Sequence, residues 1–358
     1  MSDPAEPAHT TEPSPGSFDD LTPHVVTMAV EAFFPFSLDG TVEPYASYVN
    51  RVYGLRSDDG EPLVAKFYRP GRWSREAILE EHRFLEDLVG REVPVVAPLA
   101  DEEGDTLFEV ELDPAGPEGD SDGERADSDR GAGPSSGGKA FLFALFPKRG
   151  GRSFDAESDQ DWLRLGAIVG RMHAAALREE ALQRVRVDPR SWTGAYVEEL
   201  LQSGVVHGGC AAEFEEVARS AVEQILPLFA GMPEHRLHGD CHRGNILDRP
   251  GEGLLLIDFD DMMMGPAVQD LWLLLPDHVQ EARRELELLL EGYEQFRPFP
   301  REQIELIEPL RFMRMIHFLA WRARQRQDYW FREHFPQWGN EAFWIKEIED
   351  LREQSRYF

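Results

Sequence analysis

The spacing of apolar residues divides the chain into a first part with strand patterns and a second part with helix patterns. Tyr48–Leu55 and Pro62–Tyr68 flank the turn-like SDDGE, which predicts a β-hairpin. Ser74 then starts a helical pattern that runs to about Val89, and two further strand candidates follow, the second at Ala140–Phe146. The first part is therefore predicted to be a small α+β region.

Beyond Pro147 the apolar residues recur at helical spacing. A capping box of Ser158 and Asp161 predicts the start of the first helix. Further helices are expected over 211–230, 279–296, 302–327 and 341–355. A β-like island, Leu237–Phe259, interrupts this part of the chain, which is otherwise predicted to be helical.

Acidic residues are concentrated in two segments. The net charge is −30, of which residues 1–20 carry −5 and residues 101–130 carry −11. Residues 113–138 are rich in Gly, Ser, Pro and Asp, so we expect a disordered insertion there and a disordered tail over 1–20, with an acidic docking arm as the alternative. The expected lobes are 21–147, which carries the insertion, and 148–358.

Composition excludes several classes of protein. A hydrophobic content of 42% can fill a sizeable core, which excludes wholesale disorder. No apolar run approaches the roughly 20 residues of a membrane span, and the start of the chain has no signal-peptide pattern. The two cysteines, Cys210 and Cys241, cannot form a disulfide framework, which indicates the cytoplasm. The negative charge disfavours a nucleic acid partner, and we expect a monomer.

The residues that can carry chemistry gather in the island. Asp240 and Asn245 stand five positions apart in a loop, and Asp258 follows thirteen positions later at the end of an apolar strand. A carboxylate at the end of a buried strand is costly unless it is paired or binds a metal ion. Oxygens of Asn245 and Asp258 suit Mg²⁺, and Asp240 is then available to accept a proton from a hydroxyl. This set indicates phosphoryl transfer.

The first part of the chain offers a cation for phosphates. Lys66 ends the strand-like run LVAK, and Glu81 lies fifteen positions later on the predicted helix, where it can pair with Lys66. A lysine ammonium is a familiar ligand of α- and β-phosphates. A solvated edge residue is the ordinary alternative for a lone strand lysine.

Two other kinds of site fit parts of the island less well. His238 and His242 could bind zinc, but no third or fourth ligand follows at ordinary spacing. Cys241 has no complete triad among its neighbours, so packing explains it better than a role as nucleophile.

The island and several other motifs resemble known kinases. HGDCHRGN and IDFDD resemble the motifs of the aminoglycoside phosphotransferase-like branch of the protein kinase-like fold. NRVYGL, VAKFYRPGRW, ILEEHRFL, VPVVAP, RLHGDCHRGNIL and GPAVQDLW, found in order between about residues 25 and 350, resemble the bacterial stress response kinase A family. The resemblance implies an α+β, two-lobed fold, with a small antiparallel-sheet lobe that has one main helix and a larger, mostly helical lobe. It also implies an ATP- and Mg²⁺-dependent serine/threonine protein kinase of the cytoplasm.

The same resemblance assigns roles in the larger lobe. Asp240 would be the catalytic base, and Asn245 and Asp258 would hold Mg²⁺, with Asp258 also counted as catalytic. Three residues would support the catalytic and metal loops: His238, Asp260 and Asp270.

In the smaller lobe, the resemblance implies which residues bind the nucleotide. Lys66 would grip the phosphates with the support of Glu81, and Ser47 would lie in the turn that covers the phosphates. The backbone of Ala144 and of Phe146 would meet adenine.

The acceptor stays open at this point. No G-x-G-x-x-G motif covers the phosphates, and only eleven residues separate Asp258 from Asp270, which leaves no room for an activation segment or its peptide platform. A small-molecule kinase of the aminoglycoside, choline or homoserine type is the alternative, because the same chemistry serves any hydroxyl. The intact polar set disfavours a pseudokinase that only binds.

Overall fold

The computed structural model describes Phe18, residues 20–45, Ser47 and residues 49–112, 139–326, 331 and 335–358. The predicted acidic insertion lies outside the described residues, and so does almost all of the predicted acidic tail. No helix in the described part of the chain combines the length and the apolar character that a membrane span requires.

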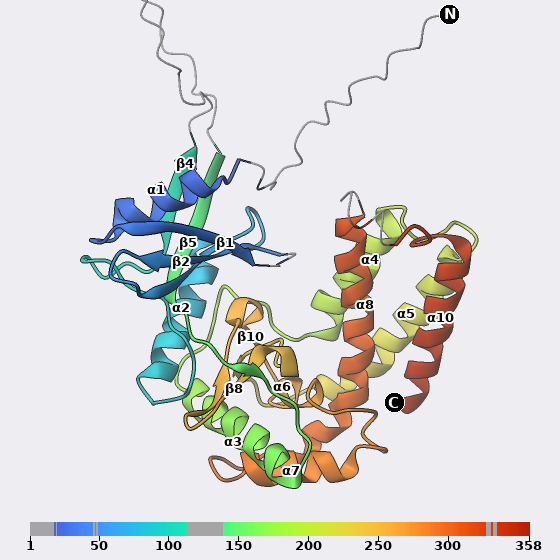
Figure 1. Cartoon of the computed structure of the whole chain (residues 1–358). Helices are drawn as coiled ribbons and strands as arrows, with labels where there is room; N and C mark the ends of the chain where they lie inside the picture. Colours follow the sequence, from blue (N-terminus) through green and yellow to red (C-terminus); the bar gives the residue numbers. More distant parts are fainter. Residues whose placement is uncertain are drawn as a thin grey trace, which may run out of the picture. The chain divides into compact units, whose positions relative to one another are not determined.

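The chain divides into two compact units. Unit 1 comprises Met1–His82 and Val96–Arg149, and unit 2 comprises Arg83–Val95 and Gly150–Phe358. Unit 1 contains the antiparallel sheet drawn in blue and green in Figure 1, and unit 2 contains most of the helices. A small sheet lobe and a larger, mostly helical lobe are what the sequence predicts.

Unit 1 is built on a five-stranded sheet in the order β1-β2-β3-β5-β4. Its elements are α1 (Pro23–Phe33), β1 (Leu38–Tyr45), β2 (Arg51–Ser57), β3 (Pro62–Phe67), the start of α2 (Arg75–Val89), β4 (Phe108–Leu112) and β5 (Lys139–Pro147). β2 and β3 form the predicted hairpin, with Leu55 opposite Leu63. The Ser74 hydroxyl accepts a hydrogen bond from the Ala77 amide at the start of α2, as expected of a helix cap.

The two faces of this sheet are covered differently. One face packs against α1, where Phe33 of the helix and Phe34, the residue after it, contact the ring of Phe108. The buried residues on this face include Tyr53, Leu55, Leu63, Ala65, Phe67, Phe143 and Leu145. Successive side chains of a strand point to opposite faces, so Lys66 lies on the other face of the sheet.

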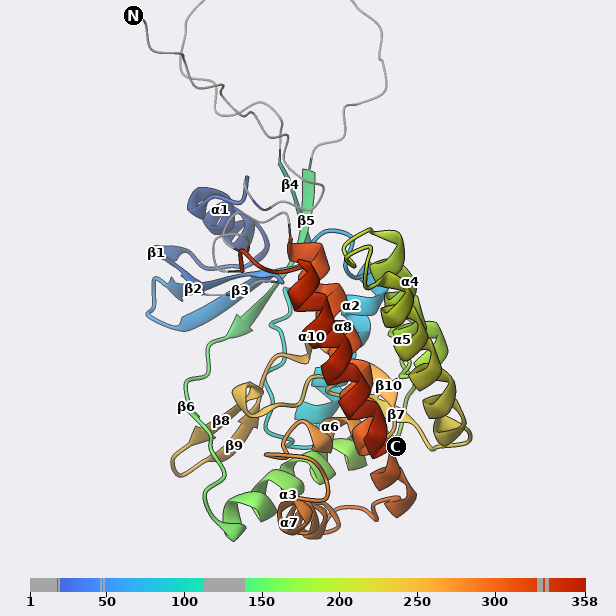
Figure 2. The same cartoon turned by 90° about the vertical axis from the view of Figure 1, so that its right-hand side faces the viewer.

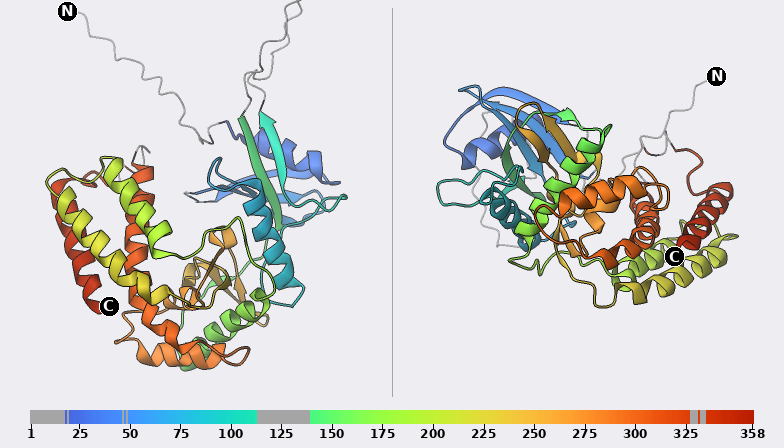
Figure 3. Two further views of the ribbon diagram at one scale, coloured as in Figure 1. Left: turned by 180° about the vertical axis from the view of Figure 1, so that it is seen from behind. Right: turned by 90° about the horizontal axis from the view of Figure 1, so that it is seen from below.

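Unit 2 combines helices with short strands that carry loops. Its elements are β6 (Arg152–Ser153), α3 (Asp159–Ala176), α4 (Gly194–Gln202), α5 (Ala211–Ile225), β7 (His235–Leu237), β8 (Ile246–Arg249), β9 (Gly253–Leu256), β10 (Met263–Gly265), α6 (Gln269–Trp272), α7 (Arg283–Tyr293), α8 (Ile307–Gln325) and α10 (Glu341–Gln354). Helices α4, α5, α8 and α10 lie side by side (Figures 1 and 2). Helix α3 packs against α7 (Figure 3). β7 pairs with β10, and β8 forms a hairpin with β9.

The periodicity of apolar residues predicted where the long helices lie more accurately than where they begin and end. The capping box of Ser158 and Asp161 is present at the start of α3. The predicted helix 211–230 is α-helical only to Ile225, because Pro227 lacks the backbone N–H that would continue it. The predicted helix 302–327 begins as a 3₁₀ turn, Arg301–Leu306, before α8.

Several elements escaped prediction, among them β1, α1 and α4. β1 is a largely exposed edge strand without apolar alternation. Helix α1 contains Val25, Val26, Thr27 and Val30, whose β-branched side chains lower helix propensity, and it is stabilised by packing on the sheet. Helix α4 is short and follows a π-helical turn over Pro189–Thr193.

Candidate functional site

Unit 1 presents a half-buried apolar surface around Lys66. The strand register places two rows of residues across β2, β3 and β5: Val52, Lys66 and Ala144, then Gly54, Val64 and Phe146. Val52, Val64 and Phe146 are only half-buried, unlike the residues of the opposite face. Tyr45 of β1 lies over Gly54. A Cβ atom at Gly54 would stand 2.5 Å from the Tyr45 hydroxyl oxygen, so the close approach requires glycine. A flat apolar surface beside an ammonium group suits a planar ring that carries phosphates.

Lys66 and Glu81 lie together, as the sequence predicts. Lys66 Nζ is 3.6 Å from Glu81 Oε1, and the two side chains are 11% and 1% exposed. Lys66 Nζ also lies 5.1 Å from the centre of the Tyr68 ring. The buried carboxylate therefore fixes the ammonium against the sheet face.

The structure corrects the expected role of two β5 residues. Ala144 is opposite Lys66 and Phe146 is opposite Val64 in the β3–β5 pair. Hydrogen bonds from Tyr68 N to Leu142 O and from Lys148 N to Pro62 O bracket this stretch. Antiparallel strands alternate in their bonding, so the backbone groups of Ala144 and Phe146 point to β3. Their side chains, not their backbone, reach the face that carries Lys66.

Ser47 lies between the ends of β1 and β2. Its carbonyl oxygen accepts a hydrogen bond from Arg51 Nη1 at 3.2 Å, which ties this turn to the start of β2. The role of its hydroxyl over phosphates stays a prediction.

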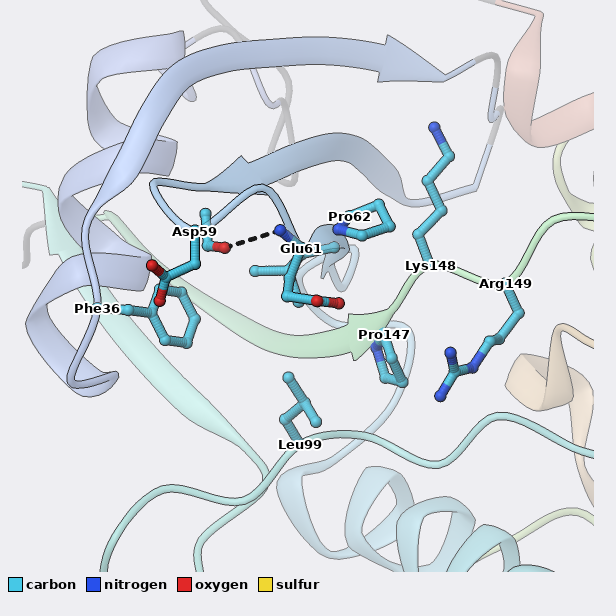
Figure 4. A pocket seen from close by; sticks show the side chains of 10 residues that line it. Phe36, Asp59, Glu61, Pro62, Leu99, Pro147, Lys148 and Arg149 are labelled. Atoms are coloured by element: carbon cyan, nitrogen blue, oxygen red, sulfur yellow. Dashed lines mark hydrogen bonds between the residues drawn. The ribbon is translucent and has the colours of Figure 1, made fainter.

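A separate pocket of about 320 Å³ lies in unit 1 at the end of β5. Figure 4 shows Phe36, Leu99 and Pro147 around it, with Lys148 and Arg149 on one side. None of the residues that the sequence assigned to the nucleotide lines this pocket.

In unit 2, two loops carry the predicted catalytic and metal residues. One follows β7 and contains Asp240 and Asn245, and the other follows β9 and contains Asp258. His238 Nε2 donates to Ile257 O at 2.9 Å, and Ile257 N donates to Asn245 O at 3.0 Å. Gly239 has a φ of +88°, and a Cβ atom at this position would collide with the Asp261 carbonyl. The two loops therefore meet along their backbones, where only glycine fits.

Asp270 anchors the loop that contains Asp240. Its carboxylate accepts the amides of His238 and Gly239 at 2.7 and 2.9 Å, and His173 Nε2 lies 3.0 Å away. Complete burial acts to raise the pKa of Asp270, but His173 and the backbone amides outweigh it and hold the pKa below its usual value. Gln269 adds a hydrogen bond from its amide to Gly239 O at 3.0 Å. The support predicted for Asp270 and His238 is thus visible as backbone anchoring.

Asn245 and Asp258 come together at the junction of the loops. Asn245 Nδ2 donates to Asp240 O at 3.0 Å, which leaves its Oδ1 as the atom for a cation. Asp258 follows Ile257 and has a φ of +63°, a conformation that only Glu92 shares among the described non-glycine residues. Such backbone strain is typical of functional sites. No group of three or more His, Cys, Asp and Glu side chains in the described part of the chain could hold a metal ion. Two ligands suit Mg²⁺, which keeps waters and phosphate oxygens.

Asp240 lies between a guanidinium group and an imidazole ring. Arg314 Nη2 of α8 lies 2.8 Å from its Oδ1, and His242 Nε2 lies 3.4 Å from its Oδ2. Partial burial acts to raise the pKa of Asp240, but the His242 hydrogen bond and the charge of Arg314 lower it to about 2. The carboxylate is therefore ionised at neutral pH and can accept a hydrogen bond from a hydroxyl.

Sequence reasoning missed His173, Gln269 and Arg314. Gln269 directly precedes Asp270, which was the one local signal. Arg314 and His173 come from distant helices, and nothing near them in the sequence indicates the contact.

Asp260 is buried, and its carbonyl oxygen accepts a hydrogen bond from Arg184 Nη1 at 2.7 Å. Cys241 is fully buried, and burial raises the pKa of its thiol.

Comparisons with known proteins agree with this geometry. Residues 41–307 match the model of the phosphotransferase enzyme family. Stress response kinase A of Escherichia coli (strain K12) is 34% identical over 346 residues, covering 95% of this chain and 94% of that protein. The serine/threonine protein kinase RdoA of Salmonella typhimurium (strain LT2) is 33% identical over 343 residues, covering 95% and 94%. An amicoumacin kinase solved with AMP-PNP and Ca²⁺ has a TM-score of 0.67 at 18% identity, covering 93% and 92% of the chains, which confirms the predicted fold.

Proposed function

The chain belongs to the phosphotransferase enzyme family and to its stress response kinase A branch, and we propose that it is an ATP- and Mg²⁺-dependent serine/threonine protein kinase of the bacterial cytoplasm. The name of the Salmonella relative supports this acceptor class. The observation that carries the proposal is the junction of two loops, where the ionised Asp240 adjoins the cation ligands Asn245 and Asp258. The enzyme acts as a monomer in a response to stress.

The reaction moves the γ-phosphoryl group of ATP to a Ser or Thr hydroxyl. The hydroxyl oxygen bonds to the γ-phosphorus while the bond from that phosphorus to the β–γ bridging oxygen breaks and ADP leaves. Asp240 orients the hydroxyl and takes its proton, which then passes to water. In a loose transition state most of this effect is positioning.

The nucleotide is held by residues of unit 1. Lys66, fixed by Glu81, binds phosphate oxygens, and Ser47 covers them. The half-buried side chain of Phe146 contacts the adenine ring from the sheet face, and the fully buried Ala144 supports Phe146 from within the cluster beneath it.

Asn245 Oδ1 and the Asp258 carboxylate would hold Mg²⁺, which would supply positive charge to the phosphate oxygens. Asp258→Asn tests this assignment, because Asn tolerates a positive φ and so keeps the backbone. A fluorescent ATP analogue should bind wild type more tightly when Mg²⁺ is added and bind Asp258→Asn equally with or without Mg²⁺. An unchanged Mg²⁺ response in the variant would remove Asp258 from the metal site.

A small-molecule kinase is the second candidate. It is favoured by the short connection of eleven residues between Asp258 and Asp270, which carries no platform for a peptide. The decisive experiment gives pure protein labelled ATP together with generic proteins and a panel of small alcohols. We expect label in protein Ser or Thr, and none with Asp240→Asn. Label only in a small alcohol would replace the proposed acceptor.

A further inference from the structure

Arg314 is the side chain of α8 that contacts the proposed base. Its guanidinium lies 2.8 Å from one carboxylate oxygen of Asp240, and its side chain is 45% exposed. Among the described residues, Asp240 is its one ion-pair partner. A guanidinium has five N–H donors in a planar fork, so most of them remain for another group.

The position of Arg314 makes it a neighbour of any acceptor. The Asp240 oxygen next to Arg314 is buried, so an acceptor hydroxyl bonds to the other oxygen. It then lies within roughly 8 Å of this guanidinium, because the width of the carboxylate separates two contacts of about 2.8 Å. An anionic group next to the hydroxyl would pair with the open donors. A cationic group there would be repelled.

The same face of α8 continues with an exposed aromatic side chain. Phe318 lies one helical turn beyond Arg314 and is 48% exposed. Trp321 stacks on it at 5.8 Å and Arg322 lies 4.3 Å from its ring centre, so the ring is held in place. The four positions from Arg314 to Phe318 rise about 6 Å along the helix, which matches about two residues of an extended peptide.

We infer that Arg314 is a positioning and acceptor-selecting residue, which holds the Asp240 carboxylate and binds an acidic side chain next to the Ser or Thr that is phosphorylated. This inference rests on the proposed protein kinase function and narrows it to Ser or Thr in an acidic stretch of polypeptide. Phe318 then contacts the peptide about two residues further along.

The experiment uses the full chain and two peptides that differ only around one Ser, with Asp and Glu in one and Lys in the other. We expect wild type to favour the acidic peptide by roughly 10- to 100-fold in kcat/KM. In Arg314→Met this preference should fall to within about 3-fold, mainly through a higher KM for the acidic peptide, because the charge is gone while the aliphatic stem stays. The affinity for an ATP analogue should stay within about 2-fold, because Arg314 contacts no residue assigned to the nucleotide.

Two further variants control for misfolding and for a general effect of removing an arginine from α8. Arg314→Lys keeps the charge but not the fork, so it should keep the acidic preference with a lower kcat, even if Arg314→Met fails to fold. Arg324→Met removes an arginine of the same helix that pairs with Glu199, and it should change neither peptide preference nor kcat.

The possible failures are distinct. If wild type labels both peptides equally, or Arg314→Met keeps the full preference, the inference is wrong while the kinase function stands. If wild type labels neither peptide but labels a small alcohol, the proposed protein acceptor fails and the inference fails with it.

Discussion

The loops of unit 2 and the sheet face of unit 1 hold their polar side chains by different means. The loop with Asp240 is fixed by several hydrogen bonds from distant segments, above all the two amides that bind Asp270. Lys66 is placed by strand register and an ion pair with Glu81. The base should therefore be sensitive to changes far from it in sequence, whereas the lysine should depend on its immediate surroundings.

The largest expected effect comes from Asp240. Asp240→Asn keeps the shape but loses the charge that accepts the proton, so kcat should fall roughly 10²- to 10⁴-fold. The affinity for ATP should stay within a few-fold, because the other assigned ligands remain. Turnover and nucleotide binding measured on one preparation decide this. Loss of binding together with turnover would make Asp240 a metal or folding residue.

The next effect tests the ion pair of unit 1. Lys66→Ala should lower phosphoryl transfer about 10²-fold, the size seen for one lost donor to a developing charge. Glu81→Gln should act through Lys66, so the double variant should be little worse than Lys66→Ala alone. A double-mutant cycle on kcat measures the coupling. If the two effects on kcat add, Glu81 does not act through Lys66.

Asp270 tests the network of unit 2. Asp270→Asn places an N–H donor against backbone amides that need an acceptor, so the free energy of unfolding should fall by about 3–5 kcal/mol. Urea unfolding measures this. The matched control is Asp155→Asn, which breaks an exposed pair with Arg243 and should have little effect. An equal loss in the free energy of unfolding for both variants would mean that the hydrogen bonds of Asp270 stabilise the fold no more than an exposed ion pair does.

The same network predicts a pH dependence of stability. Burial lowers the pKa of His235 to about 3, against about 6.5 in the unfolded chain, so the unfolded chain binds more protons between these values. Stability should therefore fall as the pH drops, by about 2 kcal/mol from this group between pH 6.5 and 5. His235→Gln should flatten the dependence of the urea midpoint on pH. A variant with the wild-type slope would exclude His235 as the cause.

The smallest effect is expected from the acidic insertion. Leu112 and Lys139 are opposite each other at the end of the β4–β5 pair, so a short Gly-Ser turn can replace residues 113–138. The kcat should stay within about 2-fold of wild type, because a short turn leaves this register unchanged. A large loss of kcat in a folded variant would assign the insertion to the active site.

Much of the site could be predicted from the sequence because its spacings are local. Lys66 and Glu81 lie on a strand and on the next helix, and Asp240, Asn245 and Asp258 lie within one loop–hairpin–loop segment. The prediction that the backbone of Ala144 and of Phe146 meets adenine was wrong, because a strand pattern does not reveal which neighbouring strand its backbone groups bond to. Arg314 could not be found, because it lies 74 positions from Asp240 on a helix whose rotation depends on packing.

The sequence by itself determined the order of strands and helices and the residue types of the catalytic loops, because periodicity and motif spacing act over a few residues. The tertiary structure decided what covers each face of the sheet, since α1 packs on the side with Phe67, whereas Ile78 of α2 joins a buried cluster with Ala144 on the side with Lys66. It also decided the surroundings of Asp240. Burial and the charge of Arg314, which lies on a helix far along the chain, act on that carboxylate only in the folded protein, together with a hydrogen bond from His242 in the same loop.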